Sequence, residues 1–397
     1  MKILFLCNKS PWPPREGGPM AMNMLAEGMA RAGHSVKILA VDSFKYHISQ
    51  QDIPSSYTAM TGIELIPVDL RVKPVPALYN LLIHRSYHVQ RFISRAFAKR
   101  VREVLKSADF DVVQMETLYM SPYLETVRSS SKARIFLRAH NIEHRIWKRV
   151  AEETRNPFKR LYINQLAKSL KKYEERVVRQ YDGVVAITAT DASYFNQLTR
   201  NVTAIPFGID PSKYPVECEN NDFPSLFTLG SMNWIPNQEG IRWFLTHVWP
   251  DVHRQFPELK YFLAGREMPG WMQSLEVGNV VVLGEVEDAR RFIASKTIMI
   301  VPLFSGSGIR IKIIEGLAMG KTIISTTLGA EGIDCRQGQD ILLADLPCDF
   351  FEMISVAVSD ADLRRKLGSN ARKLVETSYN EAVLIENLTG FYKEICL

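Results

Sequence analysis

The feature that most constrains the fold of this 397-residue chain is an alternation of short apolar runs with longer helical stretches, present in both halves. This pattern is typical of βαβ units, in which crossover helices bury both faces of a parallel sheet. In the first half we expect strands at Lys2–Cys7, Ser35–Val41, Asp111–Met115, Arg134–Ala139, Gly183–Ile187 and Val202–Ile205. In the second half we expect them at Ser225–Leu229, Leu259–Ala264, Asn279–Leu283, Thr297–Val301, Thr322–Ser325 and Asp340–Leu343. The sequence therefore predicts an α/β protein with two doubly wound, Rossmann-like sheets, whose ligand-facing loops lie at the carboxyl ends of the strands.

The domain boundary is expected after the last strand of the first half. Pro206 to Pro211 and a polar run from Glu217 to Asp222 have linker composition. We place the first domain at 1–210, the second at 211–378 and a C-terminal helix at 379–397. Helical patterns cover about 349–376 and 380–396, and the last has an apolar stripe that needs a packing surface. This helix either crosses back onto the first domain or packs on its own.

Charge is divided unevenly along the chain. The net charge of +6 is well below that of a dedicated nucleic-acid binder, and 46% hydrophobic with 23% charged residues excludes a disordered chain. Residues 1–210 carry 31 basic and 19 acidic side chains, whereas residues 211–397 carry 18 and 24. The two halves therefore face different partners, and neither is expected to bind nucleic acid.

The five cysteines are scattered and form no CxxC motif, which is typical of reduced thiols in a cytoplasmic protein. The apolar run Ile3–Cys7 is too short for a signal-peptide core, and no run of about 18 apolar residues occurs. Any membrane contact is therefore expected to be peripheral.

The first strand is followed by a loop and then by Gly17 and Gly18 at the start of a helix. Glycines let the backbone approach a ligand, and a helix N-terminus attracts anions. The spacing is not G-x-G-x-x-G, and only Asp42 follows the second strand, which disfavours a dinucleotide site. The alternative is an ordinary strand-to-helix turn.

A more specific segment runs from Ser305 to Gly308 and into a helix that carries Arg310, Lys312 and Glu315. Cations in a first helical turn oppose the helix dipole, so they indicate an anionic ligand such as a diphosphate. Glu315 is placed to accept hydrogen bonds from sugar or ribose hydroxyls. The alternative is a solvent-facing helix with an i,i+3 ion pair between Lys312 and Glu315.

His140 follows the predicted strand at Arg134–Ala139, where a ligand is expected. His144 lies one helical turn later, but no third metal ligand is identifiable, so we predict no metal site. Glu116 follows the neighbouring strand, where it either meets an acceptor or serves as a helix-start carboxylate.

Taken together, these segments resemble a family 4 retaining glycosyltransferase of the GT-B type over nearly the whole chain. The similar segments are Gly17-Gly18, Ala32–Val36, Ala139–Glu143, Ile205–Asp210, Gly230–Asn237, Leu263–Gly265, Leu283–Val286 and Ser305–Gly320. The last of these is the most specific, and it is most similar to bacterial cell-surface polysaccharide transferases.

The resemblance implies two domains facing across a cleft, with the nucleotide sugar bound mainly by the second domain and the acceptor by the first. Glu315 matches the second glutamate of the family's E-x7-E motif, whereas Ser307 replaces the first. Met232 and Asn233 occupy the place of the usual Arg/Lys pair, so the diphosphate role passes to Arg310 and Lys312. The donor-binding residues expected on this basis are Gly17, Gly18, Gly230, Gly284, Glu285, Val286, Ser307, Gly308, Arg310, Lys312 and Glu315. Of these, Gly284–Val286 are expected to contact the base of the nucleotide.

The expected reaction transfers a sugar with retention to a glycan or lipid-linked acceptor, without a cofactor or metal. Arg310, Lys312 and His140 are the expected catalytic residues, with acceptor contacts from Glu116, Asn141 and Glu143. A nucleotide-sugar epimerase of the same fold and a non-enzymatic two-domain ligand-binding protein are the alternatives.

Basic residues gather in two predicted helical regions, Arg85–Lys106 and Arg138–Arg179. We expect these regions to contact the anionic inner face of the cell membrane. The alternative is a solvated face, because Glu152, Glu153, Glu174 and Glu175 are interleaved with the cations.

Overall fold

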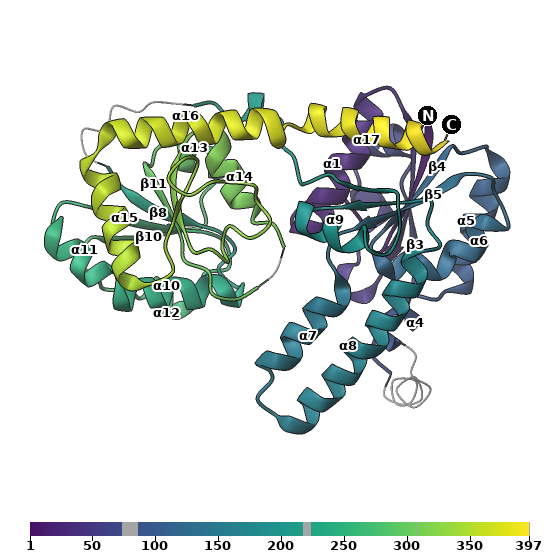
Figure 1. Ribbon diagram of the computed structural model, residues 1–397, viewed down its shortest axis with the longest axis horizontal. Coiled ribbons are helices and arrows are strands. Elements are labelled where there is room, and N and C mark those ends of the chain that lie inside the picture. Colours follow the sequence, from purple (N-terminus) through teal and green to yellow (C-terminus); the bar gives the residue numbers. More distant parts are fainter. Residues whose placement is uncertain (74–85, 217–223, 307, 397) are drawn as a thin grey trace. The chain divides into compact units, whose positions relative to one another are not determined.

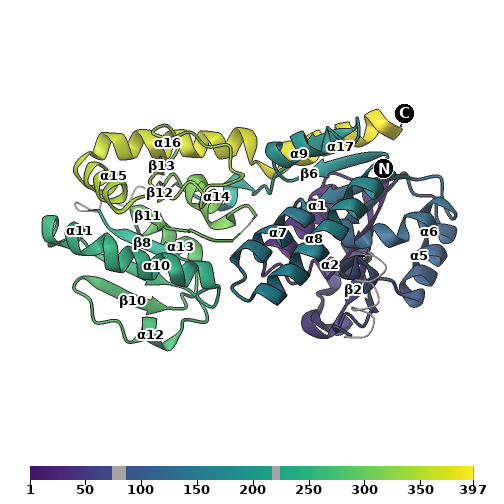
Figure 2. The ribbon, with the colours of Figure 1, turned by 60° about the horizontal axis from the view of Figure 1, so that its bottom comes forward.

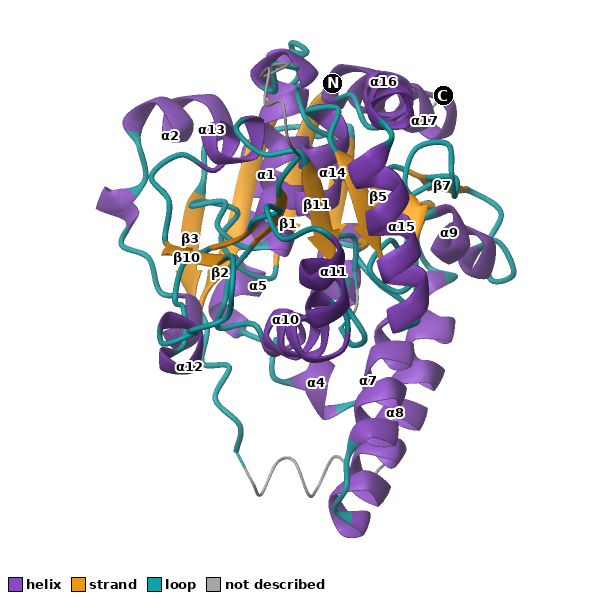
Figure 3. Cartoon of the chain, turned by 90° about the vertical axis from the view of Figure 1, so that its left-hand side faces the viewer, coloured by secondary structure: helices purple, strands orange, loops and turns teal. Residues whose placement is uncertain are grey.

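The computed structural model describes residues 1–73, 86–216, 224–306 and 308–396. The chain forms two compact units. Unit 1 comprises Met1–Phe207 and Leu384–Leu397, and unit 2 comprises Gly208–Val383. In both units the strands lie inside and the helices outside (Figure 3), as expected for parallel sheets covered on both faces. The predicted α/β class with two Rossmann-like sheets is confirmed.

Unit 1 contains a parallel sheet whose described strands are ordered β3-β2-β1-β4-β5-β6-β7. Their bounds are β1 Lys2–Cys7, β2 Ser35–Asp42, β3 Glu64–Pro67, β4 Val112–Glu116, β5 Arg134–Ala139, β6 Gly183–Ala186 and β7 Val202–Ala204. Only β3, a short edge strand, is missing from the sequence prediction. The strand order reverses between β1 and β4, which makes the loops after these two strands the place where a ligand is expected.

The helices of unit 1 cover this sheet. Those described are α1 Gly17–Arg31, α2 Ser55–Thr61, α4 Tyr87–Gln90, α5 Arg95–Ser107, α6 Leu124–Arg128, α7 Glu143–Glu153, α8 Pro157–Val178, α9 Ala189–Phe195 and most of α17 Glu381–Cys396. Short 3-10 turns η1 Phe44–Tyr46, η2 Gln50–Asp52 and η3 Leu118–Tyr123 complete the connections.

Helices α7 and α8 form an antiparallel hairpin that extends away from the sheet of unit 1 (Figures 1 and 2). The turn is encoded locally. Asn156 accepts a hydrogen bond from the Lys159 backbone N–H at 3.0 Å, and Pro157 occupies the first helical position of α8. The predicted helical region Arg138–Arg179 is therefore two helices that follow β5.

Helix α17 joins unit 1 from Leu384 onward. Its Tyr392 is fully buried, with its ring centroid 4.5 Å from that of Phe136 on β5, and Thr389 Oγ1 lies 3.2 Å from His34 Nε2. The apolar stripe of this helix therefore packs on the first domain, which is one of the two surfaces that we expected for it.

Unit 2 contains a parallel sheet with described strands in the order β10-β9-β8-β11-β12-β13. Their bounds are β8 Leu226–Leu229, β9 Tyr261–Ala264, β10 Val280–Gly284, β11 Ile298–Val301, β12 Thr322–Ser325 and β13 Leu342–Leu343. The order reverses between β8 and β11, so the loops that follow these neighbouring strands meet at one edge of the sheet.

The described helices of unit 2 are α10 Ile235–His247, α11 Trp249–Gln255, α12 Gly270–Gln273, α13 Ala289–Ala294, α14 Ile311–Ala318, α15 Pro347–Ser359 and α16 Ala361–Ser378, with the turn η4 Pro211–Lys213. The helix predicted at 349–376 is in fact two helices, which corrects that expectation. Asp360 ends α15 and accepts a hydrogen bond from the Leu363 backbone N–H at 2.8 Å, which caps α16.

Within the described ranges, no helix combines the length and the apolar character needed to cross a bilayer. The described cysteines Cys7, Cys335, Cys348 and Cys396 are free thiols.

Candidate active site

The loop after β8 in unit 2 lies close to Asn237 on α10 and to Lys312 on α14. Gly230 is the first residue after β8, and a Cβ atom placed on it would lie 2.9 Å from Asn237 Nδ2 and 3.7 Å from Lys312 Nζ. Glycine at this position thus lets the loop pass beside the N-terminal turns of α10 and α14. The positive ends of two helix dipoles are favourable for a phosphate group.

Lys312 is the second residue of α14, and its Nζ donates a hydrogen bond to Asn237 Oδ1 at 2.9 Å. Desolvation by burial, followed by the charge of Arg310, lowers the pKa of Lys312 to about 7. A lysine that has lost its hydration beside a second cation and two positive helix ends gains most from an anionic ligand. The diphosphate role expected of Lys312 stays a prediction.

Arg310 occupies the N-cap position of α14, makes no side-chain capping hydrogen bond and is 5% exposed. Its guanidinium lies 5.3 Å from the centroid of the Trp234 ring and donates a hydrogen bond to the Gly308 carbonyl. Gly306 and Gly308 both have positive φ angles, of 97° and 85°, which glycine adopts without strain. The predicted donor residue Ser307 lies outside the described residues.

Glu315 lies one turn beyond Lys312 on α14. The Tyr214 hydroxyl donates to Glu315 Oε1 at 3.1 Å, and burial raises the pKa of the Glu315 carboxyl. The alternative of a surface ion pair between Lys312 and Glu315 is wrong, because Lys312 contacts Asn237 and Glu315 contacts Tyr214. Arg290, on α13, lies 5.4 Å from the centroid of the Tyr214 ring and opposes the rise in the pKa of Glu315.

The predicted base-binding turn follows β10. Gly284 ends this strand with φ of 71°, and its carbonyl accepts a hydrogen bond from the Gly265 backbone N–H at 2.7 Å. Glu285 is exposed and Val286 is half-buried. The chain then enters α13 and reaches Arg290, which connects this turn with Tyr214 and Glu315.

In unit 1, His140 directly follows β5, and its Nε2 lies 2.6 Å from Oε2 of Glu116 at the end of β4. The Glu116 carboxylate is fully buried, so it is not available for the direct acceptor contact expected of it. Gln114 donates to Glu116, and Tyr392 of α17 donates to Gln114. The buried chain Tyr392–Gln114–Glu116–His140 holds the imidazole in place.

Arg138 lies beside this chain, fully buried on β5. It donates to the Ala186 carbonyl at 3.0 Å, and burial lowers its pKa to about 10 against the opposing effect of Glu116. The positive charge of Arg138 lies near enough to interact electrostatically with the buried Glu116 carboxylate.

The residues after His140 start α7. Asn141 is half-buried, and Glu143 is buried with its Oε2 2.7 Å from the Tyr119 hydroxyl that donates to it. Burial raises the pKa of Glu143 to about 7. His144 Nδ1 lies 2.6 Å from Glu174 Oε2, so His140 and His144 have separate carboxylate partners.

No group of three His, Cys, Asp or Glu side chains among the described residues is arranged to hold a metal ion.

Gly17 and Gly18 open α1 after β1, as predicted. A Cβ atom on Gly18 would lie 3.3 Å from Lys9 Cε, and Lys9 Nζ forms an ion pair with Glu16 at 2.9 Å. This turn belongs to unit 1, and its part in donor binding stays a prediction.

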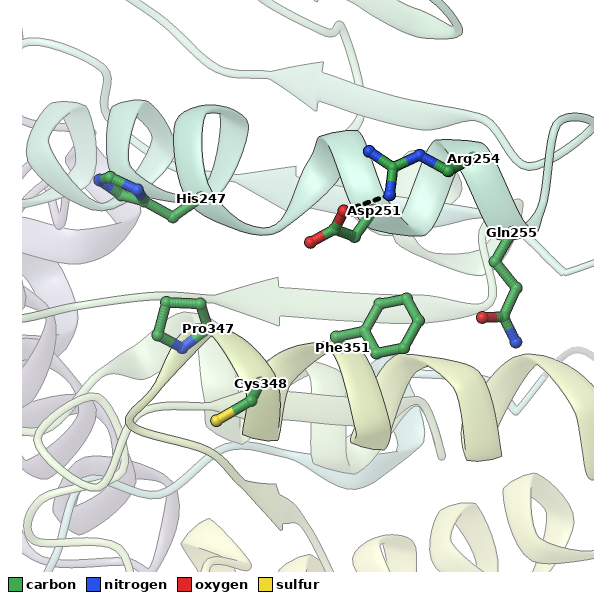
Figure 4. Close-up of a pocket in the computed structure, with 7 residues that line it drawn as sticks. All are labelled: His247, Asp251, Arg254, Gln255, Pro347, Cys348 and Phe351. Atoms are coloured by element: carbon green, nitrogen blue, oxygen red, sulfur yellow. Dashed lines mark ion pairs between the residues drawn. The ribbon is translucent and has the colours of Figure 1, made fainter.

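A groove of about 540 Å3 lies elsewhere on unit 2 (Figure 4). It is lined by His247, Asp251, Arg254, Gln255, Pro347, Cys348 and Phe351, and Asp251 forms an ion pair with Arg254 at 3.0 Å. None of the predicted site residues lines this groove.

The fold is that of a protein with two Rossmann-like domains, and Gly230, Arg310 and Lys312 lie at the switch point of the second sheet. The sequence matches the family described as Glycosyltransferase Family 4 over residues 17–213, and the family described as Glycosyl transferases group 1 over residues 223–360. These matches together span most of the chain, which therefore belongs to the glycosyltransferases.

A relative from Klebsiella pneumoniae, an uncharacterized 44.6 kDa protein in the cps region, is 20% identical over 98% of both chains. Among solved structures, sucrose-phosphate synthase from Thermosynechococcus elongatus has a TM-score of 0.71 at 14% identity, covering 100% of this chain and 99% of the other. Anabaena HepE in complex with UDP has a TM-score of 0.67 at 12% identity, covering 99% and 100%. These similarities place the chain in the GT-B fold, as the resemblance implied.

Sequence reasoning did not assign four residues that complete the donor-side arrangement: Trp234, Asn237, Tyr214 and Arg290. Trp234 and Asn237 belong to the segment Gly230–Asn237, which resembles the family. Their position directly after the first strand of unit 2 could have indicated that they lie near a ligand. Tyr214 lies 101 residues before its partner Glu315, and nothing in the sequence pattern links the two.

Proposed function

We propose that this protein transfers a sugar from a nucleoside-diphosphate sugar to a hydroxyl group of a glycan or lipid-linked acceptor, with retention at the anomeric carbon. We further propose a role in cell-surface polysaccharide synthesis on the cytoplasmic side of the membrane. The observation that carries the proposal is the position of Lys312 and Arg310 at the N-terminus of α14, beside the N-terminus of α10.

In the proposed reaction the bond between the anomeric carbon and the diphosphate breaks, and a bond to the acceptor oxygen forms. The acceptor proton passes to a leaving phosphate oxygen, so no pair of carboxylates at glycosidase spacing is required. Negative charge grows on the diphosphate as it leaves. In the proposal, Lys312 and Arg310 at the N-terminus of α14 stabilise that charge, and fixed donors of this kind supply much of a catalytic effect.

The remaining residues have supporting roles in the proposal. Glu315 accepts hydrogen bonds from the ribose hydroxyls, and the Gly284–Val286 turn contacts the base. In unit 1, His140 binds hydroxyls of the sugar or the acceptor, Glu116 positions His140, and Asn141 and Glu143 lie beside it. Two protein cations supply the positive charge that a metal would otherwise provide, so we propose that the reaction needs no metal.

Several similarities support the substrate class. Anabaena HepE has been solved with UDP and with UDP-glucose. A mutant of S. aureus TarM, with a TM-score of 0.63 and 11% identity, has been solved with Fondaparinux, alpha-GlcNAc-glycerol and UDP. The location of the Klebsiella relative in a cps region supports the polysaccharide context.

The proposal is tested by incubating the protein with UDP- and GDP-sugars, with and without EDTA, and following the products by NMR. Transfer or slow hydrolysis that releases a nucleoside diphosphate and an α-configured sugar from an α-linked donor is expected. An epimerised sugar would indicate the epimerase, and thermal stabilisation without turnover of any donor would indicate a binding protein. A β-configured product would overturn retention, and loss of activity in EDTA that Mg²⁺ restores would overturn metal independence.

A further inference from the structure

The turn of the α7–α8 hairpin exposes large apolar side chains next to cations. We define the hairpin tip as residues Arg155–Leu161, all of which are exposed. Phe158 is 83% exposed and Leu161 is 71% exposed. These two residues are three apart on α8, so they lie on the same face of the helix. An exposed aromatic and an exposed leucine side by side form an apolar patch at the end of a projecting element, which is typical of an interaction site.

Cations outnumber carboxylates around this patch. Residues 154–173 contain six cations and no acidic residue: Arg155, Lys159, Arg160, Lys168, Lys171 and Lys172. No ion pair involves Arg155, Lys159 or Arg160 anywhere in the described ranges. The nearest carboxylates in sequence are Glu152 and Glu153 at the end of α7, and Glu152 lies 3.7 Å from Lys148 Nζ. The tip therefore offers two apolar side chains together with three cations, Arg155, Lys159 and Arg160, that form no ion pair among the described residues.

Hydrogen bonds between α7 and α8 fix the end of the hairpin that lies opposite the tip. Glu174 on α8 accepts hydrogen bonds from the backbone N–H groups of Glu143 and His144 at 3.0 and 3.3 Å, and thereby caps the N-terminus of α7. Along the hairpin, Ile163, Leu166 and Leu170 are buried. The hairpin thus packs through other apolar residues, which are already buried. Phe158 and Leu161 are not needed for this packing and remain exposed.

We propose that the hairpin tip docks on an anionic lipid bilayer, with Phe158 and Leu161 entering the interface and Arg155, Lys159 and Arg160 meeting the headgroups. Charge complementarity selects an anionic surface, and the apolar pair selects a bilayer over a soluble polyanion. Interfacial sites of peripheral proteins combine these two features, because apolar burial and electrostatic attraction each contribute to binding.

The position of the hairpin also bears on how an acceptor reaches the protein. This part of the inference, unlike membrane docking itself, rests on the proposed function. Helix α7 begins three residues after His140 and has 11 residues, which corresponds to about 16 Å along its axis. A tip resting on the membrane would therefore hold the His140 loop roughly one length of α7, on the order of 16 Å or somewhat more, from the lipid surface. A lipid-linked acceptor would reach that loop without leaving the bilayer.

The proposal is tested by co-sedimentation of the full chain with vesicles of phosphatidylglycerol and phosphatidylcholine, compared with phosphatidylcholine alone, at low salt. We expect binding to the anionic vesicles only. The double variant Phe158→Ser/Leu161→Ser should bind at least about tenfold more weakly, because it removes the burial of two large apolar side chains. The matched control Phe44→Ser/Leu346→Ser changes an exposed phenylalanine and an exposed leucine elsewhere and should bind like the wild type.

A second pair of variants tests the charge. Lys159→Glu/Arg160→Glu should abolish vesicle binding, whereas Lys366→Glu/Lys373→Glu makes the same change in net charge on α16 and should retain it. The proposal is overturned if the wild type ignores anionic vesicles, if the serine variant binds as tightly as the wild type, or if the control pairs lose binding equally. UDP binding of each variant is measured in solution, so a failure of membrane docking is distinguishable from a failure of the donor site.

Discussion

The carboxylate of Glu116 lies 2.6 Å from His140 Nε2, at the carboxyl ends of two adjacent strands of unit 1. Glu116 is fully buried and His140 has only 9% of its side chain exposed. A buried carboxylate in contact with a histidine fixes the orientation of the imidazole ring. This relationship makes Glu116 a positioning residue and His140 the group that can reach a ligand.

Replacing Glu116 by Gln keeps the size of the side chain and removes its charge. We expect glycosyl transfer to fall roughly 10- to 100-fold, the loss typical when the partner that orients a histidine is removed. In a double-mutant cycle, Glu116→Gln combined with His140→Ala should cost little more than His140→Ala alone. Glu125→Gln changes an exposed carboxylate of the same unit and serves as the control. Additive losses would show that Glu116 acts independently of His140.

Lys312 and Lys321 are two lysines of unit 2 with different partners, and they form a matched pair of tests. Lys312→Ala should lower transfer by about 100-fold or more without changing the circular dichroism spectrum, because it removes a fixed charge from the leaving group. Lys321 Nζ donates to the carbonyls of Ala294 and Lys296, both at 2.7 Å. Lys321→Ala should therefore lower the melting temperature and leave UDP affinity within about twofold. Near-normal turnover by Lys312→Ala would contradict the diphosphate assignment.

The lowered pKa of Lys312, about 7, predicts that UDP binding depends on pH. The diphosphate favours the charged ammonium, so above about pH 7 each binding event takes up a proton and affinity falls as pH rises, by up to about tenfold per pH unit. Calorimetry in buffers with different ionisation enthalpies measures this uptake. In Lys312→Arg the guanidinium stays charged, so the part of the pH dependence that belongs to Lys312 should disappear. An identical pH dependence in wild type and variant would exclude Lys312 as its source.

Glu315→Gln separates the ribose from the diphosphate. If the Glu315 carboxylate holds the ribose hydroxyls, the variant should bind UDP about tenfold more weakly and bind inorganic pyrophosphate as the wild type does. Glu239, which accepts a hydrogen bond from Ser305 Oγ at 2.8 Å, supplies the control variant Glu239→Gln. Equal weakening of UDP and pyrophosphate by Glu315→Gln would assign this residue to the phosphates.

Glu143 predicts a pH dependence of stability. Its pKa is about 7 in the folded protein, above the ordinary value of 4.5, so between these values the folded state binds a proton that the unfolded state has released. The stabilisation is complete below about pH 4.5 and is lost as pH rises toward 7, a change of up to about 3 kcal/mol. Urea titrations across this range should show a flatter profile for Glu143→Gln than for the wild type. The exposed Glu152→Gln should retain the wild-type profile, and a flattened one would assign the effect to general surface charge.

The strands were predictable because each buried strand of a parallel sheet is a continuous apolar run. The edge strand β3 escaped because Glu64–Pro67 offers only two apolar residues between a charge and a proline. The break at Asp360 also escaped, although Ser359-Asp360 before an alanine is a recognisable N-cap pattern. A single N-cap pattern of this kind is a weaker signal than the helical periodicity of the residues on either side of it.

The candidate site was predictable where its chemistry is local, as at Arg310 and Lys312, which oppose a helix dipole within one turn. Its partners were not, because Asn237 precedes Lys312 by 75 residues and meets it only when β8 and β11 pair. The burial of Glu116 likewise depends on Gln114, Tyr392 and Arg138, which come from three elements of the sheet and its covering helix.

Helix α17 has a consequence for how the protein is made. Unit 1 begins at Met1 but contains Leu384 onward, and the buried Tyr392 hydroxyl donates to Gln114 in its interior. During synthesis the ribosome must therefore translate all of unit 2 before unit 1 acquires its final piece, so the unit that starts first is completed last. A fragment ending near Phe207 would expose the surface that α17 covers, whereas the same fragment fused to residues 384–397 would regain it.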